Sequence, residues 1–526
     1  AIIISDSGDD TYSASSPLRL QVDGKIALIQ YLKNYVENNG RIITPVAGEN
    51  ENNWHTAPKL NGIRLLNYLQ NQGITAYLID SYFNERNHFI HLLKERPKAV
   101  IISTTFISNK ATLVQLARDI KELDPDLFLI AGGPFVFTSY LLSKRLHDKK
   151  YDTESPKNDY LFLNVQVEPK IDLYIIDQRG ENLLAEVLGR LKKDKSLDNI
   201  PNTAYLENHH QYVFSSRTDF TPTDISVDWE KLPEPLFQSK VGNIQASTGC
   251  PYNCEFCNFV KDKRHTFIKP LDQLVEELKQ VSRKGIKYIR FVDDNFRLGK
   301  SDLNIVCQRF ISEGLDLKWM SFIRASTLSQ TNFQLLKKAG CIEVQMGIES
   351  ANPNILKGMN KQADPKMYKR VIKELLDVGI NCSCCFIVGF PGETVETFED
   401  TLEFIQNIPE KGQLGEFYWS IYPFMLLPLS PIYEAEKRKQ YNLDGYINHW
   451  THATMSSDTA YNCIKSAFQR IESPTPIYSG DNMDMLNTMS TELRKNFLNL
   501  RHAWAKEALI NGLDKSRLIK DFAKFF

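Results

Sequence analysis

Three cysteines at close, regular intervals are the strongest chemical signal in the chain. Cys250, Cys254 and Cys257 form a CX3CX2C pattern, although the chain has only nine cysteines in 526 residues. Thiolates bind iron–sulfur clusters, and four of them would close every iron of a [4Fe–4S] cube. Three leave one iron with an open position, as catalytic metal sites generally do. Structural zinc would need a fourth ligand from a second CxxC or a His pair. The sequence offers neither, so the pattern predicts a [4Fe–4S] cluster.

Composition narrows the class of protein. Hydrophobic residues make up 42% and charged residues 24%, with a net charge of −1, which is ordinary for a globular protein and gives no footprint for nucleic acid. Pro423 and Pro428 interrupt the longest apolar stretch, 417–429, so nothing approaches the ~20 residues of a membrane span. The start, AIIISDSGDD, does not read as a signal peptide. The odd number of cysteines suits a reducing compartment. We expect a cytoplasmic protein with no nucleic-acid partner and no transmembrane segment.

The cysteine loop stands within a regular series of strands and helices. Apolar strands alternate with amphipathic helices, and the predicted strands are 243–247, 286–292, 318–323, 342–347, 381–388 and 416–422. About six such units are too few for a closed eightfold barrel of ~250 residues. We therefore predict a partial (β/α)6 barrel over 241–439, followed by a helical cap over 440–526. Because the loop follows the first strand, the cluster is expected at the mouth formed by the carboxyl ends of the strands.

An earlier α/β region precedes the barrel. Helices alternate with fully apolar strands at 76–79, 99–103, 127–131 and 171–176, which is typical of a parallel, doubly wound, flavodoxin- or Rossmann-like sheet. Ligands of such sheets bind at the carboxyl ends of strands. We assign this domain to 58–192. Residues 1–57 are predicted to be an N-terminal extension, and 193–240 a linker containing a hairpin over 203–214.

The barrel region resembles the radical S-adenosylmethionine (SAM) superfamily from about 242 to 440. The resemblance rests on the cysteine loop and on four elements that follow later strands: Asp293-Asp294-Asn295, Arg324, Gly347-Ile348-Glu349-Ser350 and the Val388-Gly389 turn of a GFPGET sequence. It implies that these elements bind SAM, with Glu349, Ser350, Val388 and Gly389 near its ribose and adenine and with Phe256 packed beside the cluster. The Asp-Asp-Asn element differs from the commoner Gly-Gly-Glu form, which leaves the ligand of the SAM amino group open.

The resemblance also implies a reaction. SAM bound to the open iron would be cleaved reductively to methionine and a 5′-deoxyadenosyl radical, which would take hydrogen from a substrate. An external electron donor of the flavodoxin or ferredoxin type would be a partner, together with a small-molecule or peptide substrate. The substrate's identity and the oligomeric state are not contained in these residues.

The 58–192 domain resembles the cobalamin-binding domain of radical SAM enzymes. The residues that carry the resemblance, and would contact cobalamin, are Ser103, Thr104, Thr105, Ser108, Gly132, Gly133, Pro134, Gly180 and Glu181. The Asp-x-His-x-x-Gly motif that supplies a histidine to cobalt is lacking, so that histidine would not ligate the metal. The alternative is a generic flavodoxin-like domain without a cofactor.

This pair of domains implies a cobalamin-dependent radical SAM methyltransferase that acts on an unactivated carbon through methylcobalamin. One alternative is the same apparatus catalysing a cyclisation, ring contraction or rearrangement without methyl transfer. Another is a non-catalytic cobalamin or iron–sulfur sensor. No catalytic residue is assigned.

Four residues are candidates to face the substrate: Tyr433, His449, Trp450 and His452. An ordinary packed cap core is the favoured interpretation of the last three. Cys382, Cys384 and Cys385 lie on or beside the fifth barrel strand, where small core residues are the preferred interpretation.

Overall fold

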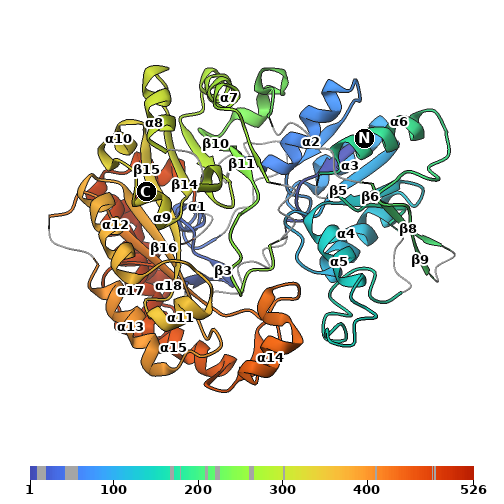
Figure 1. Ribbon diagram of the computed structural model, residues 1–526. Coiled ribbons are helices and arrows are strands. Elements are labelled where there is room, and N and C mark those ends of the chain that lie inside the picture. The colour runs from blue at the N-terminus through green and yellow to red at the C-terminus, as the bar shows by residue number, and fades with distance from the viewer. Residues whose placement is uncertain are drawn as a thin grey trace.

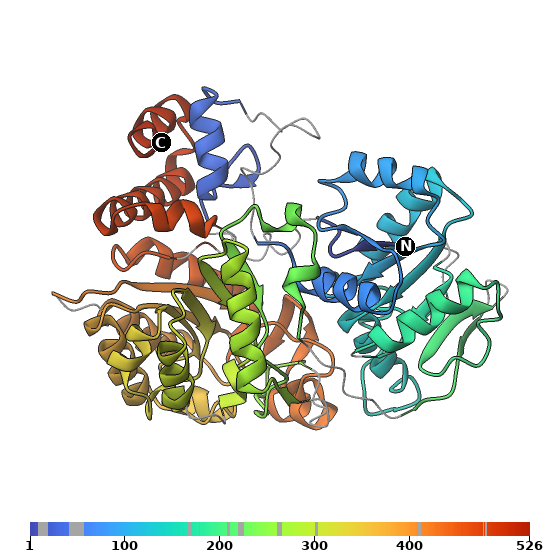
Figure 2. The ribbon, with the colours of Figure 1, turned by 90° about the horizontal axis from the view of Figure 1, so that it is seen from above.

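The computed structural model describes residues 1–8, 19–41, 57–165, 171–177, 179–207, 211–218, 226–259, 266–299, 303–408, 412–476, 478 and 481–526. Two α/β units stand side by side (Figure 1). Helices from the C-terminal part of the chain cover one side of the second unit (Figure 2). No helix in the described part of the chain is both long and apolar enough to cross a membrane.

The first unit is built on a seven-stranded sheet. Its strands are arranged in the order β4-β1-β5-β6-β7-β8-β9. The first five are parallel and follow the 2-1-3-4-5 order of flavodoxin-like folds. The bounds are β1 (Ile2–Ile4), β4 (Tyr77–Ile79), β5 (Ala99–Ser103), β6 (Phe128–Gly132), β7 (Leu173–Ile175), β8 (Thr203–Glu207) and β9 (Gln211–Phe214).

Helices cover both faces of this sheet. They are α2 (Leu60–Asn71), α3 (Arg86–Leu92), α4 (Lys110–Leu123), α5 (Pro134–Ser143) and α6 (Glu181–Lys192), with a short η3 (Leu93–Glu95). Because successive strand residues point to opposite faces, Ile3 packs in the core that contains α2 and α6. Its neighbours Ile2 and Ile4 pack in the core that contains α3, α4 and α5. The doubly wound sheet is confirmed.

The predicted extension is divided between the two units, which corrects its assignment. Strand β1 lies between β4 and β5, inside the first sheet. The following segment, with β2 (Gln21–Val22), β3 (Lys25–Ile26) and α1 (Ile29–Glu37), instead packs on helices of the C-terminal part (Figure 2). Asp481 accepts the Ile29 N–H at 2.9 Å, and Arg501 donates to the Ala27 carbonyl. A strand of three residues, far in sequence from its partners, carries too little pattern to be assigned to this sheet.

The hairpin within the predicted linker also belongs to the first sheet. Strands β8 and β9 extend its edge in antiparallel fashion. After them, η4 (Trp229–Lys231) and η5 (Glu234–Phe237) lead to the second unit. Trp229 is buried there and donates its indole N–H to Glu277 at 2.9 Å.

The second unit is an open, all-parallel sheet of six strands, as predicted. Its order is β10-β13-β14-β15-β16-β17, with bounds β10 (Val241–Ile244), β13 (Tyr288–Phe291), β14 (Lys318–Phe322), β15 (Cys341–Glu349), β16 (Asn381–Val388) and β17 (Phe417–Pro423). A small hairpin, β11 (Ser247–Thr248) and β12 (Phe267–Ile268), flanks the cysteine loop. The helices of this unit are α7 (Leu271–Arg283), η7 (Phe296–Gly299), α8 (Leu303–Ser312), α9 (Ala325–Leu328), α10 (Phe333–Lys338), α11 (Pro353–Gly358), α12 (Pro365–Asp377) and α13 (Val395–Gln406).

The C-terminal part contains a small sheet as well as helices. The strands β18 (Asp444–Tyr446), β19 (His449–His452) and β20 (Met455–Ser456) pair in antiparallel fashion. Around them lie η8 (Pro431–Tyr433), α14 (Ala435–Tyr441), α15 (Ser457–Arg470), α16 (Met483–Thr488), α17 (Thr491–Asn511), α18 (Lys515–Phe522) and η9 (Ala523–Phe525). Helix α15 contacts the last barrel strand, β17. The residues predicted to face the substrate therefore lie on a strand and a short turn rather than in a helical cap.

Candidate active site at the barrel mouth

The three cysteines of the loop share one region of the barrel mouth. Gly249 starts the turn at φ +86°, and a Cβ there would lie 2.8 Å from Thr266, so glycine suits both the backbone and the space. Burial raises the pKa of Cys250 and raises that of Cys257 to about 11, and the neighbouring thiols add to both effects. Protonated thiols are thus favoured until a cation arrives, because bound metal reverses this preference.

The donor set suits an iron–sulfur cluster, because Cys thiolates are its usual ligands. A cube spreads its ligands over three corners, and three thiolates with one open iron meet that need. Arg324 lies at 3.9 Å from the Cys254 sulfur and stacks 3.7 Å over the Tyr252 ring. Its positive charge offsets part of the negative charge that three thiolates bring.

The Asp-Asp-Asn element after β13 has three different roles. Asp293 is buried and accepts the N–H groups of Ala246 and Arg297 at 2.8 and 3.1 Å, and it also accepts the Ser247 hydroxyl. It therefore fixes the chain before the cysteine loop. Asp294 accepts the Gly249 N–H at 3.1 Å and still reaches solvent. Burial raises the pKa of both acids to about 6.

Asn295, the third member of that element, is buried. Its amide oxygen and nitrogen have no hydrogen-bond partner among the described residues. A buried amide without partners is costly, which marks this position as one where a ligand or water would complete the bonding.

Glu349, after β15, is held by a lysine that sequence reasoning missed. The Lys361 ammonium lies 2.6 Å from its carboxylate, with both side chains nearly buried. A Cβ on Gly347 would lie 2.3 Å from Glu349 Oε1, so the glycine makes room for the pair. The carbonyl of Lys361 accepts from Arg324, and its ammonium lies 5.9 Å from the Phe256 ring centroid. The lysine stands well beyond the strand end, where no local pattern marked it.

Ser350, the next predicted residue, is fully buried and accepts the Asn352 N–H at 3.1 Å. This hydrogen bond lies at the start of α11.

The Val388-Gly389 turn after β16 is buried. The Val388 carbonyl accepts from Phe424 N at 2.8 Å, and Gly389 N donates to Glu393 Oε2 at 2.6 Å. Burial raises the pKa of Glu393 to about 8, so this carboxyl is largely protonated at neutral pH. Glu393 is the glutamate of the GFPGET sequence, and the sequence alone assigned it no role. The signal that could have indicated its contact with the turn is its position four residues after Gly389.

In the first unit, the predicted strand-end residues divide into buried and exposed ones. Thr104 is buried and donates to the Gly132 carbonyl at 2.9 Å. Thr105 and Ser108 are exposed, while Ser103 is almost buried and lies 3.1 Å from the Thr105 hydroxyl. Gly133 has φ +115°, and a Cβ there would lie 3.1 Å from Thr104 Oγ1. Pro134 is the first residue of α5, where a missing N–H costs nothing.

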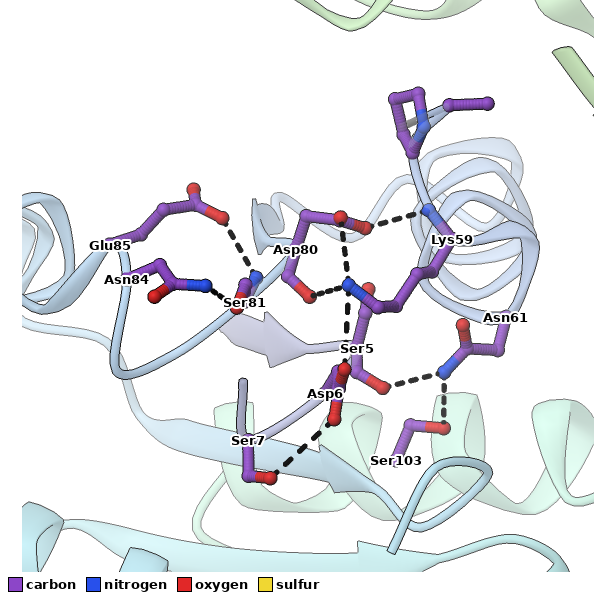
Figure 3. A network of polar contacts seen from close by, with 12 residues as sticks. Ser5, Asp6, Ser7, Lys59, Asn61, Asp80, Ser81, Asn84, Glu85 and Ser103 are labelled. Atoms are coloured by element: carbon purple, nitrogen blue, oxygen red, sulfur yellow. Dashed lines mark hydrogen bonds and ion pairs between the residues drawn. The ribbon is translucent and has the colours of Figure 1, made fainter. Parts of the chain in front are cut away.

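Sequence reasoning missed the polar network next to these residues (Figure 3). The Lys59 ammonium lies 3.4 Å from Asp6 and 3.2 Å from Asp80. Burial acts to lower the pKa of Lys59, but these two carboxylates outweigh it and raise the pKa. Asn61 donates to the Ser5 carbonyl and to Ser103 Oγ, each at 2.8 Å. The available signal was the Ile-Ile-Ile run followed by Ser-Asp-Ser, a strand with polar residues at its carboxyl end.

Gly180 and Glu181 lie where the two units meet. Arg64 donates to Glu181 at 2.8 Å and to Gln245, beyond β10, at 3.0 Å. Arg179 donates to Thr248, just before the cysteine loop. A Cβ on Gly180 would lie 2.4 Å from Ile175. These predicted cobalamin residues therefore contribute to the junction of the units.

A second set of contacts joins the units beside β17. The buried Tyr433 donates to Asp152 at 3.1 Å, and the Tyr151 hydroxyl accepts the Leu429 N–H at 2.6 Å. Arg438 also pairs with Asp152 at 3.3 Å. Tyr433, predicted as a candidate substrate contact, thus carries an interdomain hydrogen bond.

The remaining candidates are placed behind the mouth or away from it. His449 is exposed, whereas Trp450 and His452 are buried and stacked with ring centroids 5.2 Å apart. Both contact the Gly389 turn, and their burial agrees with the packed-core interpretation. Cys382 and Cys384 are fully buried and 3.5 Å apart. Cys385 takes the other face and contacts the Ser420 hydroxyl at 3.4 Å.

Comparison with protein families identifies the second unit. Residues 244–405 match the family model of the radical SAM superfamily. This segment is a radical SAM domain, and it holds the cysteine loop and every predicted SAM-binding residue.

Curated relatives extend the likeness into neighbouring sequence. An uncharacterized methyltransferase of Pyrococcus horikoshii is 29% identical over 323 residues, which is 59% of this chain and 63% of the relative. The anaerobic magnesium-protoporphyrin IX monomethyl ester cyclase of Cereibacter sphaeroides is 26% identical over 375 residues, covering 65% and 57%. The chain thus spans less than two thirds of the length of either relative.

Solved structures share the arrangement of both units. The cobalamin-dependent SAM radical enzyme OxsB, with aqua-cobalamin and SAM bound, superposes with a TM-score of 0.58 at 15% identity, covering 88% of this chain and 72% of OxsB. The radical SAM methyltransferase TsrM of Kitasatospora setae, with cobalamin and a [4Fe–4S] cluster bound, has a TM-score of 0.54 at 16% identity, covering 72% and 74%. The chain therefore has the fold of the cobalamin-dependent radical SAM enzymes.

Proposed function

We propose that the protein is a cobalamin-dependent radical SAM enzyme that methylates an unactivated carbon. The observation that carries the proposal is the pairing of two strand-end surfaces in one chain. One belongs to a radical SAM domain with three thiols and an arginine at its mouth, and the other to a flavodoxin-like sheet with exposed hydroxyls near its switch point. The methyltransferase relative and the likeness to TsrM support methyl transfer as the reaction.

In this proposal the cluster would supply an electron to SAM, and cobalamin would supply the methyl group. Cys250, Cys254 and Cys257 would hold three irons. Asp294, the acid that still reaches solvent, would accept the SAM ammonium, and Arg324 would face its carboxylate. An ammonium beside Asp294 would favour the ionised carboxylate, because an opposite charge offsets burial. Asn295 would complete its amide hydrogen bonds on the bound ligand or on water held with it.

The first unit would bind cobalamin mainly through neutral groups. Thr105 and Ser108 are exposed in the loop between β5 and α4, and hydroxyls there suit the amide side chains of a corrin ring. Because Gly133 has no side chain, the end of β6 would leave space for a large ligand to approach. The free cysteines suit a reducing compartment, so we place the reaction in the cytoplasm, with an external electron donor and a small-molecule or peptide substrate.

The test is an anaerobic assay of the reconstituted chain with SAM, cobalamin and a low-potential reductant. We expect 5′-deoxyadenosine, S-adenosylhomocysteine and, with a substrate present, a product heavier by one methylene unit. SAM carrying a deuterated methyl group would transfer that label to the product. Iron and cobalamin bound without any 5′-deoxyadenosine would contradict the proposal and identify a non-catalytic sensor.

A cyclisation without methyl transfer is the second candidate, because the Cereibacter relative is named a cyclase. It uses the same mouth and predicts 5′-deoxyadenosine without S-adenosylhomocysteine. The mass of the product distinguishes the two reactions.

A further inference from the structure

The turn after β16 is buried and contacts the side chains of Glu393, His452 and Trp450. Gly389 donates its N–H to Glu393 at 2.6 Å, and its carbonyl lies 3.1 Å from His452 Nε2. A Cβ on Gly389 would lie 2.3 Å from the Trp450 ring, and φ is +91°. Both polar backbone groups of this glycine therefore already have a partner within the protein. The close approach that the glycine permits is to Trp450.

The contacts of its two ring nitrogens fix the protonation state of His452. Because a carbonyl only accepts, Nε2 must carry a hydrogen. The Thr454 N–H, 3.3 Å from Nδ1, can only donate, so Nδ1 carries none; the Thr454 hydroxyl lies 3.1 Å from the same nitrogen. Burial lowers the pKa of His452, which favours this neutral form. The ring is thus held at both nitrogens.

Trp450 makes this arrangement rigid. Its ring is nearly parallel to that of His452, at 6°, and its indole N–H donates to the Phe424 carbonyl at 2.7 Å. Phe424 N in turn donates to the Val388 carbonyl at 2.8 Å. One strand of the C-terminal part, β19, therefore sets the position of the last residues of β16.

Trp450 and His452 contact the turn after β16, and the face of the strand that carries Cys385 and Ile387 points toward the mouth. Alternate residues of a strand share a face, so Ile387 shares its face with Cys385. Phe386, on the opposite face of the strand, packs against Phe404 of α13 with ring centroids 6.2 Å apart, so Cys385 and Ile387 face away from that helix. Ile387 is half-buried, while Val388 is buried on the opposite face. Ile387 is therefore the last residue of β16 that can lie against a bound nucleoside.

We propose that His452 is a positioning residue for SAM: by holding the Gly389 carbonyl from behind, it sets where Ile387 meets the adenosyl end of the cofactor. This inference rests on the proposed function, since it takes SAM as the ligand of the mouth. It also gives the buried His-Trp pair a role that packing alone would not require.

Two substitutions of His452 test the hydrogen bonds of its two ring nitrogens separately. His452→Gln places an amide N–H near the position of Nε2 and keeps donation to Gly389. His452→Asn places its oxygen near Nδ1, keeps acceptance from Thr454 and loses Gly389. His449→Asn, on the exposed face of the same strand, is the matched control. Loss of one neutral hydrogen bond corresponds to a roughly tenfold effect at most.

The first measurement is equilibrium dialysis of SAM against cluster-loaded, unreduced enzyme, in which no turnover occurs. We expect the Kd for SAM to rise about tenfold in His452→Asn and to stay within about threefold in His452→Gln and His449→Asn. In turnover, the change in His452→Asn should fall on the KM for SAM rather than on kcat. Equal SAM affinities for the Asn and Gln variants would overturn the inference.

The second measurement needs no cofactor. Amide hydrogen exchange in the chain as isolated should become faster at Gly389 and Phe390 in His452→Asn, with the Gln variant close to the parent. If the Asn variant does not fold, Thr454→Ala gives a milder test, because it removes only the hydroxyl partner of Nδ1. Unchanged exchange at Gly389 in a folded Thr454→Ala protein overturns the inference. Absence of SAM binding in the parent chain would instead refute the proposed function.

Discussion

The two sheets present strand ends of opposite chemical character. The barrel mouth collects ionisable groups whose charged forms burial disfavours, namely Cys250, Cys257, Asp293 and Asp294. The end of the first sheet offers neutral hydroxyls and one lysine already paired with two carboxylates. The mouth therefore gains most from a cationic or metallic ligand. The other surface suits a large neutral ligand that brings its own hydrogen-bonding groups.

The largest expected difference concerns the cysteines. Cys254→Ala should remove the cluster and reduce 5′-deoxyadenosine formation to background, because three thiolates are the minimum that leaves only one iron open. Iron and sulfide analysis after anaerobic reconstitution provides the measurement. Cys463→Ala, in α15, is the control and should bind a full cluster. Cobalamin binding should be unchanged in both, and its loss in Cys254→Ala would break the separation between the two surfaces.

Loss of one partner of an ion pair should cost more stability at the barrel mouth than at the end of the first sheet. Lys361→Met leaves Glu349 without its partner in a nearly buried site, and we expect the free energy of unfolding to fall by about 3–5 kcal/mol. Lys59→Met disrupts a pair that is more exposed, so we expect a loss of roughly 1 kcal/mol.

Urea denaturation of each variant measures these losses. The double variant Lys361→Met with Glu349→Leu should recover part of the loss, since no uncompensated charge remains. Equal losses at Lys361 and Lys59 would show that the two surfaces do not differ in this respect.

The pH dependence of SAM binding tests the acid at the mouth. Asp294 has a pKa raised to about 6, and only its ionised form attracts an ammonium. SAM affinity should therefore be constant above that pH and should fall as pH decreases through about 6. Asp294→Asn should weaken SAM binding by roughly 10- to 100-fold, as expected for a charge-assisted hydrogen bond.

Titration of SAM between pH 5 and about pH 8 measures this dependence. The Asn variant should show no such step. The same raised pKa has a separate effect on folding, because the native state keeps a proton that the unfolded state loses near pH 3.8. This acid therefore reduces stability as pH rises from 3.8 to about 6. If the fall in SAM affinity near pH 6 persists in Asp294→Asn, the acid responsible is Asp293 instead.

The smallest effect is expected at the first sheet. Ser108→Ala removes one exposed hydroxyl from the loop between β5 and α4, and we expect cobalamin affinity to fall about 2- to 10-fold with no change in stability. Absorbance titration with hydroxocobalamin gives the affinity. Ser196→Ala, exposed beyond α6 in the same unit, is the matched control. Equal affinities for both variants would remove Ser108 from the binding surface.

The sequence predicted the parts of the fold that repeat a local pattern. The six barrel strands, the cysteine loop and the order of strand-end elements follow from periodicity and motif, because each is written in a few neighbouring residues. The place of β1 in the first sheet was missed, since the first of its partner strands starts 75 residues later. Lys361 was missed for a similar reason: its importance lies in the charge it pairs, and nothing in the surrounding residues identifies that partner.

Residue type also left the surroundings of some side chains open. Tyr433 and Trp450 are aromatic residues near a barrel mouth, so each was a candidate substrate contact, although packing was the favoured interpretation of Trp450. Their hydrogen bonds to Asp152 and to the Phe424 carbonyl depend on the packing of units far apart in sequence. Residue type predicts what a side chain can bind, whereas tertiary packing decides which partner it meets.

The placement of α1 on the C-terminal helices has a consequence for synthesis of the chain. The N–H of Ile29 is bonded by Asp481, 452 residues further along. While the ribosome is still making the barrel, the segment around α1 lacks the surface that satisfies it, although β1 just before it already belongs to the first sheet. Loop closure over such a distance is slow compared with local folding. The segment around α1 is therefore completed only after the barrel, and a chain released before Asp481 would leave that segment open to proteases and chaperones.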